Sequence, residues 1–316
     1  MARALGYNAS LIFAYESSEG VAEATGEYWK LPFVSCDLGA EQGLLDDEVL
    51  GLGRDPQAPT YDLKRVGGTI VVPLDINNIG FWLKLVYGAP STTGAGPYTH
   101  VFTSGGTSPV TACIEIGYPN VPAYFMNTGI KGDSIQFGVT RTGKPIATIQ
   151  VIGQDEAKDT SATDATPNEL AYTRFNAFEG SIKRNGTALS NVVSADMTYS
   201  NQLEAVETLR ADALIEGVDL GMGKLNGSIT SRFAATTLYD DAVAATALDI
   251  LLLFDNATQS LTIEAQSALL PVAKRPVSGP GGVEVTQNFQ GALDSGEGEM
   301  MEVTLVNSTA TYVNAT

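Results

Sequence analysis

The sequence predicts a mainly β fold made of two tandem domains, each with one α-helix and one long loop between two strands. Short runs rich in Thr, Val and Ala alternate with turn residues, and the chain has 33 glycines among 316 residues. This composition favours strands joined by turns. Residues 34–38 also recur as residues 193–197, so the offset in numbering is 193 − 34 = 159. A repeat of about half the chain indicates a duplicated domain, because solenoid repeats are shorter.

The repeat continues without a gap to Ile70, which aligns with Ile229. Its matches cluster at two ends, Val-Ser-x-Asp at the first and Gly-x-Ile at the second, around a variable middle. Two strands joined by a long loop and copied once would give this pattern. We expect one domain at residues 1–158, a second at 165–316, and a linker at 154–168 that is rich in Asp, Ser, Thr and Ala.

Composition and charge narrow the classes of protein. The chain is 44% hydrophobic and 17% charged, which fits globular domains that bury their own cores. Its net charge is −18 and it has no run of Lys or Arg, so it lacks the basic patch of a DNA-binding protein. The acidity serves solubility, or it keeps nucleic acid from sticking, and both interpretations stay open.

Targeting segments and cysteines indicate the compartment of synthesis. The first residues lack the apolar core of a signal peptide, and no apolar run is long enough to span a bilayer. We expect synthesis in the cytoplasm, with Cys36 and Cys113 reduced. Cys36 aligns with Ala195, which suits a small residue on the inner side of a strand.

Alternating side chains predict the first strands. Leu11–Tyr15 and Tyr28–Leu38 fit strands, and in the second of these Val34, Cys36 and Leu38 share an apolar face. Ser35 and Asp37 share the polar face, and the second copy repeats this division with Ser194 and Asp196.

The long middle loop is expected at residues 39–67, which hold several acidic residues, glycines and prolines. Its counterpart is expected at 198–226, where Leu203–Leu214 suggests a helical turn or two. A loop of this length inside a compact domain is usually functional or disordered.

The first helix is expected between Asn78 and Gly88. Apolar residues in this stretch fit both a helical face and strand alternation. Asn78 as a cap and Gly88 as a stop favour a helix. In the second copy Thr237–Asp240 has a capping-box pattern, which opens a segment that runs to about Ala247.

The remaining strands follow from alternation between turn signals. They are expected at Thr69–Leu74, Thr99–Thr103, Thr111–Ile116, Ser134–Thr140 and Ala147–Ile152, and in the second copy at Ser228–Phe233, Leu248–Phe254, Leu261–Ala265, Val283–Asn288 and Met301–Val306. Asn185-Gly186 predicts a two-residue hairpin turn.

No motif indicates catalysis, a cofactor or a metal. His100 is the only histidine, which argues against a multi-histidine metal site or a Ser or Cys triad. Residues 217–225 fail the phosphate-loop pattern, because Leu225 stands where Ser or Thr is needed. Asp46, Asp47 and Glu48 lack the alternating pattern of a calcium loop. A glycosidase carboxylate pair cannot be recognised from one sequence. We therefore expect a protein that is not an enzyme.

Several phrases of the first half resemble the tail tube (major tail) proteins of long-tailed bacteriophages and related prophages. They are Ala4-Leu5-Gly6-Tyr7-Asn8, Leu31-Pro32-Phe33-Val34-Ser35-Cys36-Asp37-Leu38-Gly39, Gly53-Arg54-Asp55-Pro56 and Gly96-Pro97-Tyr98-Thr99-His100-Val101-Phe102-Thr103-Ser104. The resemblance covers about residues 1–153, and the second half shares it only through the internal repeat.

The resemblance implies β-sandwich or barrel-like domains that form rings of six and stack into a channel for genome ejection. Because this chain carries two domains, we expect a homotrimeric, pseudo-hexameric ring. The implied partners are further copies of the chain and tape-measure, tail-terminator and baseplate or distal tail proteins. Double-stranded DNA would pass without specific binding, and the protein would reside in the virion tail after synthesis in the host cytoplasm, without a membrane.

Two groups of site residues follow from this resemblance. The candidates for facing the lumen are the polar strand residues Ser35, Asp37, Ser194, Asp196 and Thr230. The candidates for ring stacking are the loop residues Asp46, Asp47, Glu48, Arg54, Asp55 and Pro56. The alternative is a duplicated β-sandwich that binds a ligand, like a lectin or adhesin, which predicts monomers or dimers with a ligand pocket.

Overall fold

The computed structural model describes residues 3–141, 143–277 and 279–315. Strands dominate, and the described residues contain two α-helices, which confirms the mainly β fold. We call residues 3–159 the first half, 177–315 the second half and 160–176 the connecting segment. None of the helices in the described part of the chain is long and apolar enough to cross a membrane.

Strands are the main regular structure of each half, with a short 3-10 helix and one α-helix beside them in the described residues. The first half holds η1 (Gly6–Asn8), β1 (Ser10–Tyr15), β2 (Trp29–Lys30), β3 (Ser35–Cys36), β4 (Gly39–Leu45), β5 (Thr60–Pro73), α1 (Ile79–Tyr87), β6 (Ser91–Thr93), β7 (Tyr98–Thr103), β8 (Ala112–Tyr118), β9 (Ala123–Thr140), β10 (Ile146–Gly153) and β11 (Asp155–Asp159). The second half holds η2 (Ala177–Glu179), β12 (Gly180–Arg184), β13 (Thr187–Ala188), β14 (Val192–Ser200), β15 (Glu204–Val206), β16 (Gly217–Asp219), β17 (Lys224–Arg232), α2 (Thr237–Ala244), β18 (Leu248–Asp255), β19 (Ser260–Leu269), β20 (Glu284–Gly291) and β21 (Met301–Asn307).

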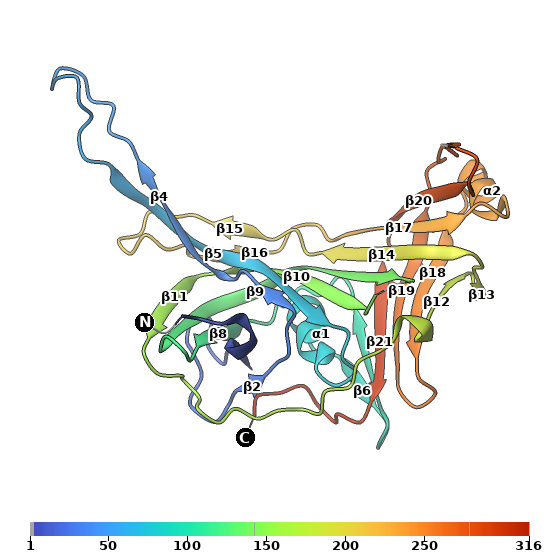
Figure 1. Cartoon of the computed structure of the whole chain (residues 1–316), viewed down its shortest axis with the longest axis horizontal. Helices are drawn as coiled ribbons and strands as arrows, with labels where there is room; N and C mark the ends of the chain where they lie inside the picture. Colours follow the sequence, from blue (N-terminus) through green and yellow to red (C-terminus); the bar gives the residue numbers. More distant parts are fainter. Residues whose placement is uncertain (1–2, 142, 278, 316) are drawn as a thin grey trace.

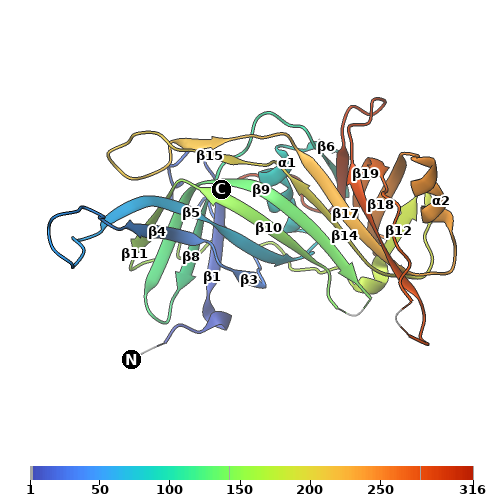
Figure 2. The same cartoon turned by 90° about the horizontal axis from the view of Figure 1, so that it is seen from above.

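One antiparallel sheet, which we call the inner sheet, runs through both halves. Its strand order is β3 and β4, then β5, β10, β9, β14, β17 and β20. The strands lie side by side along one surface of the molecule (Figure 2). The pairing of β9 with β14 joins the two halves, so the inner sheet is continuous from the first half into the second.

Apart from β15 and β16, which pair only with each other beside the inner sheet, most of the other strands lie on the far side of the core from the inner sheet (Figure 1). In the first half β2, β1, β8, the start of β9 and β11 pair in that order. In the second half β13, β12, β18, β19 and β21 repeat the order. The core between these layers includes most of α1. The β6–β7 hairpin of the first half pairs with β21, which ties the halves together a second time.

The register of strand pairing repeats as well as the order. Ser35 lies opposite Val71, and at the same offset of 159 in numbering Ser194 lies opposite Thr230. In the next strands Lys131 lies opposite Ile152 and Leu269 lies opposite Gln290, where the offset is 269 − 131 = 138. The offset falls because the β6–β7 hairpin lies in the first half alone, among the described elements. Positions related by these offsets are equivalent in the two halves.

One of the strand predictions for the first half is wrong. Tyr28–Leu38 is not one strand, because β2 pairs with β1 in the outer layer whereas β3 pairs with β5 in the inner sheet. The chain changes layers around Pro32, and Val34 is 57% exposed rather than part of an apolar face.

The predicted loop at 39–67 is also wrong in extent. β4 and β5 pair through most of it and leave residues 46–59 outside strands. In the counterpart, Leu203–Leu214 contains β15 and no helix. The sequence misleads here because much of each hairpin is exposed, so its strands lack the apolar alternation of a buried face.

Both helices form where the sequence predicts them. Gly88 ends α1 with φ 91°, a conformation that suits glycine. Asp75 rather than Asn78 caps its start, since Asp75 Oδ1 accepts from the amides of Asn77 and Asn78. In the second half Thr236, one residue before the predicted position, precedes α2. The hairpin turn at Asn185-Gly186 is confirmed, with positive φ at both residues.

The predicted linker at 154–168 is partly structured. Asp155–Asp159 forms β11, which pairs with β9. The connecting segment then runs in extended form from the first half to the second (Figure 1). The division at 158 and 165 stays a prediction.

Candidate functional site

One face of the inner sheet packs on the core and the other carries polar side chains. A single row of directly opposed residues crosses seven strands, and only one of them, Val71, is apolar. From β3 to β20 the row is Ser35, Val71, Thr148, Gln136, Thr198, Asn226 and Gln290. We call this surface, with the parallel rows beside it, the polar face. It is continuous across the joint between the halves.

All five residues predicted from the strand pattern lie on the polar face: Ser35, Asp37, Ser194, Asp196 and Thr230. The backbone amide of Thr69 donates to Asp37 Oδ1, and Ser228 Oγ donates to Asp196 Oδ1 at 2.5 Å. Thr230 Oγ1 lies 2.9 Å from Thr286 Oγ1. The two carboxylates are thus held in place by neighbouring donors.

Other residues of this face were not predicted. They are Gln136, Thr148, Gln150, Asn226, Ser228, Thr286, Asn288 and Gln290. Most lie in strands that were expected, but Asn226 was placed in the loop at 198–226 and Gln290 lies beyond the expected strand Val283–Asn288. Gln136 and Gln150 alternate with buried Ile135, Phe137 and Ile149. The alternation was therefore a usable signal, but the sequence does not show which strands share one sheet.

The hairpin of β4 and β5 extends from the body as an arm, with residues 46–59 at its tip (Figure 1). All six predicted stacking residues, Asp46, Asp47, Glu48, Arg54, Asp55 and Pro56, are exposed on it. Large apolar side chains are exposed as well: Leu44, Leu45, Val49, Leu50, Leu52 and Tyr61. Large apolar side chains exposed together on one hairpin indicate an interaction site.

The equivalent segment of the second half, residues 201–223, lies against the first half instead. Asn201 Nδ2 donates to the carbonyl oxygens of Val86 and Gly132 at 2.8 and 2.9 Å. Glu207 pairs with Arg65 at 2.9 Å. Ile215 and Val218 are buried. Of the two equivalent segments, residues 201–223 therefore pack against the first half, whereas the arm extends away from the body.

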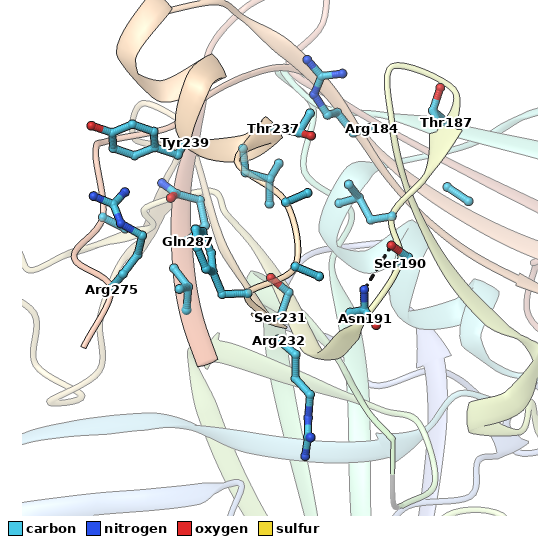
Figure 3. A pocket seen from close by; sticks show the side chains of 18 residues that line it. Arg184, Thr187, Ser190, Asn191, Ser231, Arg232, Thr237, Tyr239, Arg275 and Gln287 are labelled. Atoms are coloured by element: carbon cyan, nitrogen blue, oxygen red, sulfur yellow. Dashed lines mark hydrogen bonds between the residues drawn. The ribbon is translucent and has the colours of Figure 1, made fainter. Parts of the chain in front are cut away.

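A cavity of about 210 Å³ lies in the second half between β17, the β12–β13 hairpin and the start of α2 (Figure 3). Three arginines border it, but none is aimed at its centre as a free cation. Arg184 pairs with Asp241, Arg275 lies 4.1 Å from the centre of the Tyr239 ring, and Arg232 points away from the cavity. The lining does not converge on a ligand as a binding pocket would.

The residues weighed for catalysis have structural positions. His100 is fully buried, and its ring nitrogens lie 2.8 Å from Thr92 Oγ1 and from the Thr309 carbonyl oxygen. Within residues 3–141, 143–277 and 279–315, no group of three His, Cys, Asp or Glu side chains is placed to hold a metal ion.

Comparison with known proteins agrees with this geometry. No curated protein matches the chain. A family model described as phage tail tube protein matches residues 6–291, which include the polar face, the arm and both helices. A match over nearly the whole chain shows that the protein belongs to the phage tail tube protein family, a structural family of the virion tail.

Proposed function

We propose that three copies of this chain close into a ring, and that stacked rings form a tube whose lumen is lined by the polar face. The observation that carries the proposal is the β9–β14 pair, which joins two equivalent halves into one sheet. If the same joint forms between chains, three chains give six equivalent units. Repeated head-to-tail contacts of this kind close into a cyclic ring.

The register of the joint between chains follows from the joint within the chain. In the β9–β14 pair Tyr199 lies opposite Ile135. The equivalent positions are Ala40 on β4 and Ala273, which follows β19. We therefore place residues 272–277 of one protomer beside residues 36–41 of the next. Residues 36–41 lie at the β3 and β4 end of the inner sheet, and residues 272–277 follow β19, whose last residues pair with β20 at the other end.

A pair of surface hollows supports this register. One lies at the joint within the chain and is lined by Ala177, Phe178 and Val192 of the second half together with Val139 of the first. The equivalent hollow beside Gly6, Tyr7 and Phe33 has no such contribution from a second unit. Residues 276–277 of the adjacent protomer would supply it.

Paired cysteines test the ring. The Ala40→Cys/Ala273→Cys variant should form disulfides between chains and give covalent trimers on a denaturing gel, since directly opposed strand positions meet the geometry of a disulfide. Each single variant is the control for reaction with Cys36 and Cys113. Native mass spectrometry counts the chains, and six chains per ring would contradict the proposal.

The lumen wall follows from the same arrangement. With the apolar side of the inner sheet packed on the core, the polar face is left for the channel. Its hydroxyl and amide groups, with Asp37 and Asp196, would let DNA slide, because DNA carries about one negative charge per ~1.7 Å of axis and a cationic wall would hold it.

Charge reversal tests the wall. Replacing Asp37 and Asp196 by lysine in virions should slow DNA ejection most at low salt, where screening is weakest. Replacing both by asparagine is the matched control that removes charge without reversing it. Ejection of the lysine variant at the normal rate in low salt would show that these side chains do not face DNA.

The arm suits contact between rings. Its exposed leucines and acidic tip reach beyond the body of the chain (Figure 1). Deleting residues 46–59 should leave a folded protein that forms rings but no tubes by negative-stain microscopy. A Gly/Ser tip of equal length separates the effect of reach from that of the apolar side chains. Tubes of normal length from the deletion variant would exclude the arm from stacking.

A further inference from the structure

The end of the connecting segment bridges the two halves. Residues 173–175 lie along residues 74–76 of the first half, just before α1. The Phe175 amide donates to the Leu74 carbonyl at 3.0 Å, and the Ile76 amide donates to the Thr173 carbonyl at 2.8 Å. Arg174 Nη2 donates to the Pro145 carbonyl at 2.8 Å. These bonds fix the start of the second half to the core of the first.

The same local pattern occurs at the start of the first half. A short 3-10 helix precedes β1 at Gly6–Asn8 and precedes β12 at Ala177–Glu179, and here the offset in numbering is 177 − 6 = 171. At this offset Arg3 is equivalent to Arg174. Tyr7 is equivalent to Phe178, and both aromatic rings are exposed, by 82% and 93%. Arg3 and its neighbours are thus a second copy of the bridging stretch.

The surface that would receive this second copy is uncovered. Leu74 is fully buried beneath residues 173–175, whereas its equivalent Phe233 is 42% exposed. The backbone has the same form at both places, since the Phe233 amide donates to the Val283 carbonyl as the Leu74 amide does to that of Pro145. In the part of the chain that the structure describes, no group bonds to the Phe233 carbonyl oxygen or the Ala235 amide.

We propose that Arg3 and Ala4 of one protomer lie along Phe233–Ala235 of the adjacent protomer, at the edge of the cavity in Figure 3. The Ala4 amide donates to the Phe233 carbonyl, and the Arg3 guanidinium donates to the Val283 carbonyl. That oxygen has a second lone pair for it. The inference rests on the proposed ring. It concerns a neighbouring chain because the N-terminus and α2 lie at opposite ends of the molecule (Figure 1).

The contact differs from the strand joint proposed above. That joint connects the inner sheets, whereas this one lies beside α2, behind the inner sheet. It would cover the exposed ring of Phe233 and pair backbone groups that the isolated chain leaves to solvent. It also gives the poorly buried second half a cover that the first half receives from residues 173–175.

Cross-linking tests the contact directly. In assembled rings, the Ala4→Cys/Phe233→Cys variant should give covalent trimers. The equivalent residues Phe175 and Leu74 lie close enough for a hydrogen bond between their backbones. Tyr7→Cys/Phe233→Cys is the matched control, since Tyr7 lies in the same exposed segment but should not react. Single variants report any reaction with the native cysteines.

The Arg3→Ala variant gives an independent measurement. Loss of a hydrogen bond from a charged donor should raise the protein concentration for half-assembly about tenfold, with Arg3→Lys closer to the wild type. The melting temperature of the unassembled chain should not change, because Arg3 is exposed there.

Failure of this inference can be told from failure of the ring. Rings that form, and that Ala40→Cys/Ala273→Cys locks as trimers, but that give no Ala4–Phe233 cross-link would overturn the inference alone. Absence of rings under all conditions would overturn the proposed function itself. Unchanged half-assembly of Arg3→Ala would also contradict the inferred contact.

Discussion

The two α-helices occupy equivalent places in the two halves and have opposite surroundings. In α1 eight of nine residues are buried, among them Phe81 and Trp82. At the equivalent positions α2 has Asp240 and Asp241, and its buried residues are Asp241 and Ala242. The C-terminal Tyr312 packs on α1, where its ring meets Phe81 at 5.2 Å between centroids. No equivalent tail covers α2 among the described residues.

The outer layers also differ, since apolar residues of the first half have acidic equivalents in the second. Cys113 and Met126 are buried in a small cluster of the first half. Ala112 lies opposite Ile130 as Leu248 lies opposite Ala268, so the offset in β8 is 248 − 112 = 136 and the equivalent of Cys113 is Asp249. The equivalent of Met126, at the offset of 138, is Glu264. The first half thus has an aromatic core with its own cover, while the second half has a thinner core with ionisable groups at its edge. We infer that the first half carries most of the stability and that the second half keeps surface for contacts between chains.

Trp82→Ala should have the largest effect on stability. Trp82 is 1% exposed and packs on Phe13 at 5.5 Å between ring centroids. Truncating a buried Trp costs about 3–5 kcal/mol of the free energy of unfolding, through lost burial and the cavity left behind. Denaturant unfolding of the unassembled chain measures it. A loss no greater than that of Asp241→Ala would contradict the comparison of the helices.

Gly80→Ala should have the next largest effect. A Cβ at this position would lie 2.0 Å from Cζ of Tyr312, so the ring must move. Overpacking of this kind costs about 1–3 kcal/mol. In a variant that already carries Tyr312→Ala, Gly80→Ala should be nearly neutral, because the ring that the new Cβ would meet is gone. In the second half the equivalent residue is Tyr239, which is partly exposed, and Tyr239→Ala should change the free energy of unfolding by less than about 1 kcal/mol.

The helix α1, the repeat and the arm show which parts of the fold could be predicted from the sequence. Apolar spacing, Asn78 and Gly88 were sufficient to predict α1, and the Val-Ser-x-Asp repeat predicted two equivalent strand pairs. The same repeat could not show that β9 pairs with β14, because pairing between halves depends on contacts distant in sequence. The repeat also did not indicate that the arm is a hairpin with exposed leucines. Strands without a buried face do not show the alternation of apolar and polar residues by which a strand is recognised.

The ion pair of α2 should contribute less than the aromatic core of α1. Arg184 Nη2 lies 2.5 Å from Asp241 Oδ1, and the two side chains are 23% and 11% exposed. The hydrogen bonds that Arg184 donates to the Asp241 carboxylate raise the pKa of Arg184. Asp241→Ala leaves a largely buried guanidinium without this acceptor and should cost about 1–3 kcal/mol. A double-mutant cycle with Arg184→Ala isolates the pair, and a coupling energy near zero would show that the contact does not stabilise the second half.

The smallest predicted effect is a pH dependence confined to the outer layer of the second half. Burial raises the pKa of Glu264 to about 7, with smaller contributions from Asp249 and from Glu302, which lies directly opposite on β21. In the first half the equivalent position is Met126, which does not titrate. At this position of the fold, only the stability of the second half should therefore depend on pH near neutrality.

The sign follows from the direction of this shift. The raised pKa means that the folded chain holds the proton more tightly than the unfolded chain, so the stabilisation is complete below the ordinary value of 4.5 and is lost as pH rises through about 7. Glu264→Gln keeps the neutral form at every pH. Its melting temperature should therefore fall less than that of the wild type between about pH 5 and about pH 8. Met126→Leu is the control in the first half and should leave the pH dependence unchanged. An equal fall in the wild type and in Glu264→Gln would assign the pH dependence to other groups, and the outer layers of the two halves would then not differ in this respect.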